Sequence, residues 1–218
     1  MNKSIILFKL SKDTIDTKKI VDEVVQKPIL ISGLIYGLSS EDKRVKYRCA
    51  KILKLLSEKY PKMLQEHIDL FIKLLETDNT ILKWNAILIL GNLAKVDTEN
   101  KINKVLVTFY GLLNAGVMIT ANNTIISLGK IAEAKPELRG NITLEFLNIE
   151  KYQYDTKECN NIAVGQVVMA ISSYFPLLEG YKEEVIQFVK RQLNNMRNAT
   201  QKKAENFLKK YNIHNTCT

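Results

Sequence analysis

Few side chains in this sequence could act as a nucleophile, a general base or a metal ligand. The chain has three cysteines, Cys49, Cys159 and Cys217, and two histidines, His67 and His214. Cys49 and His67 could form a nucleophile–base pair, but a cysteine on an apolar helix face is usually a small core residue. The five residues are too scattered for zinc, and no glycine-rich phosphate loop or GxSxG motif occurs. We therefore expect no enzyme, no cofactor and no metal.

The cysteines also bear on the cellular compartment. Their odd number and wide spacing argue against a disulfide framework, which favours a reducing environment. The apolar stretch near the N-terminus, residues 5–8, is too short for a signal sequence or a membrane span. We expect a cytoplasmic protein that does not insert into membranes.

The charge is strongly positive and unevenly placed. The formal net charge is +9, and the surplus of lysine and arginine lies in the first 60 and the last 40 residues. Such basic ends either attract phosphates and acidic proteins or keep the protein soluble. Both interpretations stay open, and the candidate contacts for phosphate or an acidic partner are Lys46, Arg197, Lys202 and Lys203.

The elements that must position these side chains are helices. Glycine occurs 9 times and proline 4 times in 218 residues, and strand-forming residues do not alternate with polar ones. Sparse helix breakers and long amphipathic runs are typical of helical proteins. The sequence predicts an all-α protein, long enough to bury a core in one domain spanning 1–218.

The helices recur with a period. Pro61 and Pro136 each follow a lysine near the end of a helical run and lie 75 residues apart, or two units of roughly 37 residues. A unit reads as helix, polar turn and helix, as in "PILISGLIYGLSSEDKRVKYRCAKILKLLSEKY". The predicted units span 28–60, 63–96, 101–135, 137–176 and 179–212, with 14–27 as an N-terminal cap helix.

The turns inside the units carry residues that cap helices. An N-cap side chain accepts a hydrogen bond from an otherwise unpaired backbone N–H of the first turn. The candidates are Ser39 or Ser40, Asp78 or Asn79, and Asp155 or Thr156.

The second helices of the units are apolar nearly all round. A helix packed against its own partner and against units on both sides needs such a surface, so no membrane is implied. One buried stripe repeats after 38 residues, and a glycine that allows close helix approach repeats with it. The stripes are Ile87, Leu90 and Ala94, then Ile125, Leu128 and Ala132, and the glycines are Gly91 and Gly129.

The turn "EDKRVKYR", with Asp42, Val45 and Arg48, resembles the HEAT repeat. Later units depart from that pattern, since "TDNTILKW" has Trp84 where an arginine is expected. The string "LKWNA…LGNLAKVD…MITANN" is also similar to microbial HEAT-repeat proteins. The resemblance implies a right-handed α-α superhelix, a HEAT-like solenoid of about five helical hairpins. It further implies a scaffold that binds macromolecules along a concave face lined by second helices.

A polar ladder lies on these otherwise apolar second helices. The amides occupy either an open groove or hydrogen bonds between repeats, because an unpartnered buried amide costs about 1–3 kcal/mol. Trp84 is either core packing or an exposed anchor for a partner. The candidate groove residues, which we call the ladder residues, are Arg48, Trp84, Asn85, Asn92, Asn122, Asn123, Lys130 and Asn161.

Two functions follow as hypotheses. The first is a non-catalytic scaffold that binds a protein or peptide partner on its second-helix surface. The alternative is binding of DNA or RNA by the basic ends, which would weaken steeply as salt rises. HEAT-like DNA glycosylases pair groove aromatics with a catalytic acid, and the ladder lacks that acid.

Overall fold

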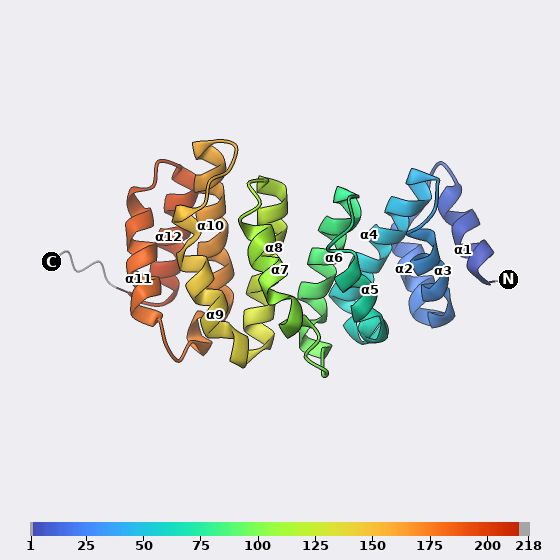
Figure 1. Ribbon diagram of the computed structural model, residues 1–218, viewed down its shortest axis with the longest axis horizontal. Coiled ribbons are helices and arrows are strands. Elements are labelled where there is room, and N and C mark those ends of the chain that lie inside the picture. The colour runs from blue at the N-terminus through green and yellow to red at the C-terminus, as the bar shows by residue number, and fades with distance from the viewer. Residues whose placement is uncertain (1, 214–218) are drawn as a thin grey trace. The chain divides into compact units, whose positions relative to one another are not determined.

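The protein is built from helices alone over the residues that its structure describes. A computed structural model describes residues 2–213, with side chains from residue 4 onward. This part of the chain contains twelve α-helices, several short 3₁₀ helices and no strand (Figure 1). The prediction of an all-α protein is confirmed.

The chain divides into two compact units. Unit 1 is Met1–Ile102 and unit 2 is Asn103–Thr218. His214 and Cys217, which the sequence analysis considered for chemistry, lie outside the described residues.

Unit 1 consists of two helical hairpins preceded by two further helices. The hairpins are α3 with α4 and α5 with α6, and α4 packs along α6. Helix α1 packs against α3 and α4, and α2 packs against α4. The α-helices are α1 (Asn2–Ser11), α2 (Thr17–Gln26), α3 (Ile31–Gly37), α4 (Lys43–Lys59), α5 (Ile68–Lys73) and α6 (Thr80–Leu93). The 3₁₀ helices are η1 (Pro28–Leu30), η2 (Pro61–His67) and η3 (Ala94–Val96).

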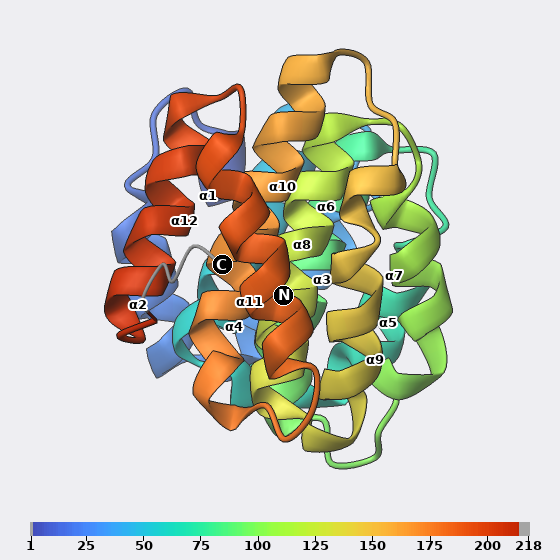
Figure 2. The ribbon, with the colours of Figure 1, turned by 90° about the vertical axis from the view of Figure 1, so that its left-hand side faces the viewer.

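Unit 2 consists of three hairpins arranged in two rows. Helices α8, α10 and α12 pack side by side in one row, and α9 and α11 are neighbours in the other (Figure 2). The α-helices are α7 (Leu106–Leu113), α8 (Met118–Ala134), α9 (Pro136–Leu147), α10 (Lys157–Tyr174), α11 (Lys182–Arg191) and α12 (Asn198–Lys210). The 3₁₀ helices are η4 (Ile102–Val105), η5 (Ile149–Lys151), η6 (Phe175–Leu177) and η7 (Gln192–Asn194).

The second helices of three hairpins begin at polar caps. Asn79 caps α6 and Thr156 caps α10, each by accepting from the backbone N–H three residues ahead. The expectation of Ser39 or Ser40 as the cap of α4 was wrong. Asp42 takes that place, because its extended backbone lets one carboxylate oxygen reach two backbone N–H groups of the first turn.

The first helix of the chain was not expected. The sequence analysis placed no helix before residue 14, yet α1 forms over Asn2–Ser11. Ile6 and Leu10, one turn apart on its inner face, are fully buried in unit 1. Because so short a helix is marginal by itself, its packing against α3 and α4 is what stabilises it.

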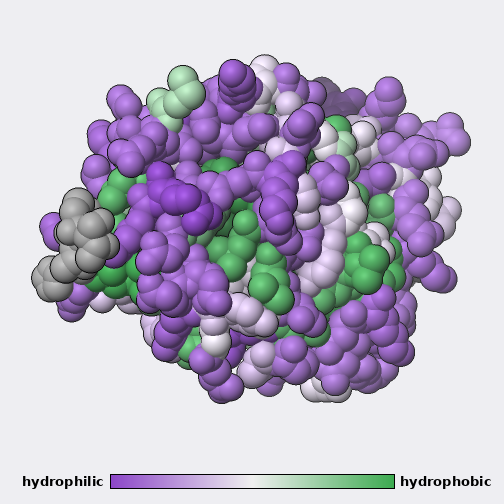
Figure 3. Space-filling view, turned by 60° about the vertical axis from the view of Figure 1, so that its left-hand side comes forward, coloured by the Kyte–Doolittle hydropathy of each residue, from purple (hydrophilic) through white to green (hydrophobic). Residues whose placement is uncertain are grey.

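The predicted apolar stripes form the core of their hairpins. All six of their residues are buried, within a few per cent of full burial. A Cβ atom on Gly129 of α8 would lie 3.0 Å from that of Ala170 on α10, so the glycine permits close contact of these two helices. Outside the core, hydrophilic side chains cover most of the face in Figure 3, with patches of hydrophobic residues between them. None of the helices described combines the length and apolarity that a membrane span requires.

Candidate functional site

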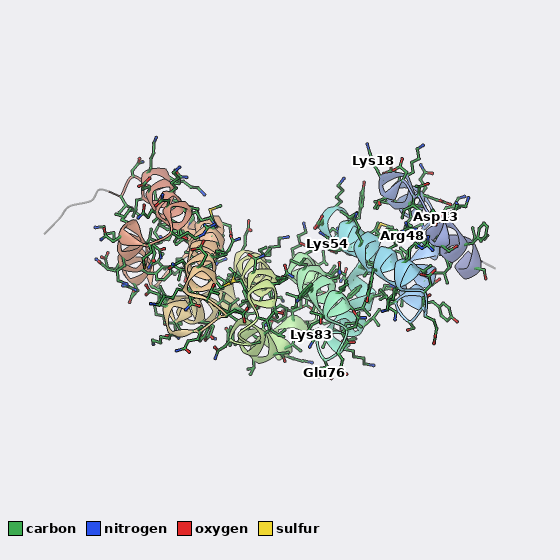
Figure 4. All side chains as sticks on the ribbon, turned by 90° about the horizontal axis from the view of Figure 1, so that it is seen from above. Asp13, Lys18, Arg48, Lys54, Glu76 and Lys83 are labelled. Carbon is green, nitrogen blue, oxygen red and sulfur yellow. The ribbon has the colours of Figure 1, made fainter. Side chains whose placement is uncertain are left out.

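The predicted ladder residues of unit 1 are mostly engaged within the protein. The guanidinium of Arg48 on α4 points toward the end of α1 (Figure 4) and donates to the backbone oxygens of Leu10, at 2.7 Å, and Asp13, at 2.9 Å. Asn92 on α6 is only 7% exposed and donates to the Ser57 hydroxyl on α4 at 2.8 Å. Arg48 and Asn92 therefore join helices, and their assignment to a partner-binding groove stays a prediction.

The other two ladder residues of unit 1 lie together near the start of α6. Asn85 is half-buried, and its amide donates to the backbone oxygen of Ile81 one turn earlier, at 2.8 Å. Trp84 is half-buried beside it. A partner could reach part of each side chain.

The ladder residues of unit 2 are half-buried. Asn122, Asn123 and Lys130 lie on α8, and Asn161 lies on α10. The side-chain oxygen of Asn122 is buried without a hydrogen-bond partner among the described residues. The backbone oxygen of Asn161 accepts a hydrogen bond from the Thr200 hydroxyl on α12 at 2.8 Å, which ties α10 to α12.

The predicted basic contacts differ in their availability. The Nε of Arg197 donates to Glu158 at 2.6 Å, and Lys203 donates to Gln166 at 3.1 Å, so both bind α10. Burial, and secondarily the charge of Arg197, lower the pKa of Lys203. Lys202 is exposed and Lys46 is half-buried. Two of the four candidate contacts are therefore occupied within the protein.

Cys49 is unsuited to nucleophilic catalysis. Its side chain is fully buried, and burial raises the pKa of the thiol to about 12. A thiol acts as a nucleophile only as the thiolate, which burial suppresses. Among the described residues, no three histidine, cysteine or acidic side chains gather as a metal site would require.

This burial predicts a selective alkylation pattern. When the folded protein is treated with iodoacetamide at about pH 8, we expect Cys159, which is half-buried, to be modified while Cys49 remains protected. In urea both should react at similar rates. Peptide mapping by mass spectrometry would measure this, and rapid modification of Cys49 in the folded protein would contradict the assignment of Cys49 to the core.

Two adjoining pockets form a groove in unit 1. Pocket A has a volume of about 480 Å³ and is lined by Lys59, Tyr60, Pro61, Lys62, Met63, Lys95 and Val96. Pocket B has a volume of about 380 Å³ and is lined by Thr17, Lys18, Val21, Asp22, Lys51, Leu55, Lys59 and Tyr60. Lys59 and Tyr60 belong to both pockets, which together we call the unit 1 groove.

Local sequence explains the position of the groove. Lys51, Leu55 and Lys59 follow one another at intervals of four, so they share one face of α4. Helix α4 ends at Lys59 because Pro61 follows, and the chain then turns into η2. Pocket B lies between this face and α2, and pocket A lies where η2 meets η3.

The groove combines an apolar floor with a positive rim. Five exposed lysines line it, and none of them forms an ion pair within the described part of the chain. Asp22 is the single carboxylate in the lining of the two pockets. Lys54, also on α4, is instead paired with Glu58 at 3.2 Å.

Sequence reasoning missed this groove. Lys18, Lys51 and Lys59 were counted only in the basic surplus of the first 60 residues, Lys62 and Lys95 lie beyond it, and none of the five was selected. The segment "KILKLLSEKYPK", at 51–62, carried a signal in its lysines around a proline-terminated helix. Helices α2 and η3 also contribute lining residues to the groove. Their positions depend on how the helices pack, which cannot be read from the spacing of apolar residues in the sequence.

Comparisons with known proteins support the fold. No family model matches the sequence, and no curated protein matches it. The crystal structure of an engineered protein from the Northeast Structural Genomics Consortium matches with a TM-score of 0.64 and 14% identity, covering 96% of each chain. A designed armadillo repeat protein matches with a TM-score of 0.60 and 15% identity, over 96% of this chain and 99% of the other.

A third similar structure is a designed armadillo repeat protein in complex with the peptide (KR)4. Its TM-score is 0.61 at 13% identity, over 87% of this chain and 84% of the other. Likeness at this identity shows the fold alone. The protein is an α-solenoid repeat protein, which confirms the predicted fold class.

Proposed function

We propose that the protein is a non-catalytic scaffold that binds a segment of a partner protein in the unit 1 groove. The observation that carries the proposal is the groove itself, an apolar floor rimmed by exposed lysines that form no ion pair with the residues that the structure describes. Binding sites combine apolar concave surface with a few polar groups that fix orientation. Pocket B lies along α4, the second helix of its hairpin, and pocket A lies at the end of that helix.

Two further observations support this proposal. Cys49, the one cysteine considered as a nucleophile, is buried and protonated. A similar solenoid is in complex with a peptide, so this fold can accommodate an extended segment.

We also keep the half-buried Trp84, Asn85, Asn123 and Lys130 as proposed secondary contacts. Free cysteines at Cys49 and Cys159 agree with the proposed cytoplasmic location.

Nucleic-acid binding is the second candidate. The observation that favours it is the same set of exposed lysines, together with the net charge of +9. Phosphates need cationic and hydrogen-bonding groups, whereas the floor of pocket A is made of Tyr60, Pro61, Met63 and Val96. An apolar floor suits a peptide side chain better, which ranks the protein partner first.

Site-specific photocrosslinking in the native cell tests the proposal. We replace Tyr60, which lies in both pockets, by benzoylphenylalanine and identify adducts by mass spectrometry, with and without nuclease. Tyr36 on α3 is the matched control, since it is also exposed and in unit 1 but does not line the groove.

A protein adduct at Tyr60 that persists after nuclease treatment and is absent at Tyr36 would support the scaffold. Adducts removed by nuclease would support nucleic-acid binding instead. No adduct specific to Tyr60 would refute the assignment of the groove.

A further inference from the structure

We propose that the segment bound in the unit 1 groove is acidic and carries one apolar anchor residue, which enters pocket A while flanking carboxylates meet the lysines. This inference rests on the proposed function and adds the chemistry of the partner. It identifies the occupant as an acidic peptide segment.

The charge of the groove selects an anionic partner. The charged residues in the lining of the groove are five lysines and one acid, Asp22. Complementary charge raises the association rate and disfavours partners of like charge. Because all five lysines are exposed, each ion pair should change affinity only about two- to fivefold, so the effect depends on several acting together.

The floor of pocket A selects an apolar side chain. Pro61 and Val96 are buried, Met63 is half-buried, and Tyr60, which also lines pocket B, is 38% exposed. Methionine adapts its shape to irregular partners, and a tyrosine offers a rigid contact surface. Water leaves such a floor readily when a leucine or phenylalanine enters, which gives the segment its anchor.

The two pockets also predict the order of residues in the segment. Lys59, Lys62 and Lys95 surround pocket A, so carboxylates are favoured on both sides of the anchor. In pocket B, Asp22 lies among Lys18, Lys51 and Lys59, so the residue opposite Asp22 should not be acidic. The expected pattern is acidic, apolar, acidic and then neutral along the groove from pocket A to pocket B.

The positive rim excludes the ligand seen with the similar solenoid. That armadillo protein is in complex with (KR)4, a peptide of alternating lysine and arginine. Such a peptide would bring positive charges next to the lysines of the unit 1 groove, which would repel it. The two proteins would therefore share a fold but bind ligands of opposite charge. The (KR)4 peptide therefore serves as a negative control in the binding experiment.

Fluorescence anisotropy with defined probes tests the inference on the full chain. The probe is a labelled peptide of about ten residues, long enough to span both pockets at ~3.3 Å per residue, with Asp and Glu around one leucine. Three further probes are the same peptide with serine in place of leucine, the (KR)4 peptide and an oligothymidylate.

Charge-reversal variants identify the site. The groove variant is Lys51→Glu, Lys59→Glu, Lys62→Glu and Lys95→Glu. The matched control is Lys73→Glu, Lys104→Glu, Lys182→Glu and Lys209→Glu, which changes net charge equally at exposed lysines outside both pockets. Circular dichroism establishes that both variants are folded.

We expect the leucine probe to bind, the serine probe to bind about tenfold more weakly, and (KR)4 not to bind. The groove variant should weaken the leucine probe at least about thirtyfold, and the control variant less than about threefold. Equal loss in both variants, equal binding of (KR)4, or tighter binding of the oligothymidylate would overturn the inference.

The outcomes separate this inference from the proposed function. Protein adducts at Tyr60, together with probe affinities that do not depend on probe charge, would leave the scaffold in place and refute the acidic partner. If the Tyr60 crosslinker captures nothing and no probe binds, both proposals are overturned.

Discussion

Replacing Phe207 by alanine is expected to lower the free energy of unfolding by about 3–5 kcal/mol, the range for a large buried aromatic. Phe207 lies on α12 and is 2% exposed. Its ring centroid is 4.9 Å from that of Phe175 and 4.9 Å from that of Tyr211, with edge-on geometry in both pairs. Alanine would remove both ring contacts and leave a cavity under the last helix.

In the Phe207→Ala variant, we expect α12 to unfold locally before the rest of the protein unfolds. In repeat proteins each element is stabilised mainly by its neighbours, so a terminal helix can unfold alone. Amide hydrogen exchange should accelerate first in α12 while unit 1 keeps its protection, and urea denaturation gives the total change. Phe207→Leu is the control, expected to cost only about 1 kcal/mol because most of the volume remains. Equal acceleration of exchange in α4 and α12 would contradict this local picture.

Replacing Arg48 by alanine is expected to cost about 3 kcal/mol and to release α1. Arg48 donates to the backbone oxygens of Leu10 and Asp13, and also to that of Lys12, so it supplies partners for carbonyl groups in the last turn of α1 and just past its end. Hydrogen bonds from a charged donor contribute about 1.5–3 kcal/mol each, and partial solvation of these carbonyls reduces the total.

A second arginine on the same helix provides the control. Arg44 lies one turn before Arg48 and pairs with the carboxylate of Asp13, whose side chain is 95% exposed. Because exposed ion pairs contribute under about 1 kcal/mol, Arg44→Ala should change stability little. The measurement is urea denaturation combined with hydrogen exchange in α1. Equal effects of the two substitutions would show that net charge, and not the backbone contacts, holds the helix.

The motif that suggested a HEAT repeat has a physical explanation here. Asp42 caps α4, Val45 is buried in the core, and Arg48 binds the end of α1. The spacing predicted that these three residues matter. It could not show that Arg48 binds α1, at Leu10 38 residues earlier, because that helix has little amphipathic pattern of its own.

The success of the fold prediction and the oversight of the unit 1 groove have related causes. Helical period, proline punctuation and buried stripes such as Ile125 and Leu128 are local properties that a sequence displays directly. Asn92 was ambiguous because the same amide suits a groove or an interhelical bond, and only the position of Ser57 decides between them. The lysines of the groove form one site only in the folded structure, where α2, α4, η2 and η3 pack together.

The hydrogen bonds between hairpins have a consequence for folding kinetics. The bond from Asn92 to Ser57 spans 35 residues, that from Arg139 to the backbone oxygen of Leu177 spans 38, and that from Arg191 to Glu150 spans 41. These bonds close loops of about one repeat. Loop closure of this length is entropically inexpensive, and proteins dominated by local helical contacts fold in microseconds to milliseconds. We therefore expect each unit to fold rapidly, beginning at whichever hairpin forms first and spreading to its neighbours.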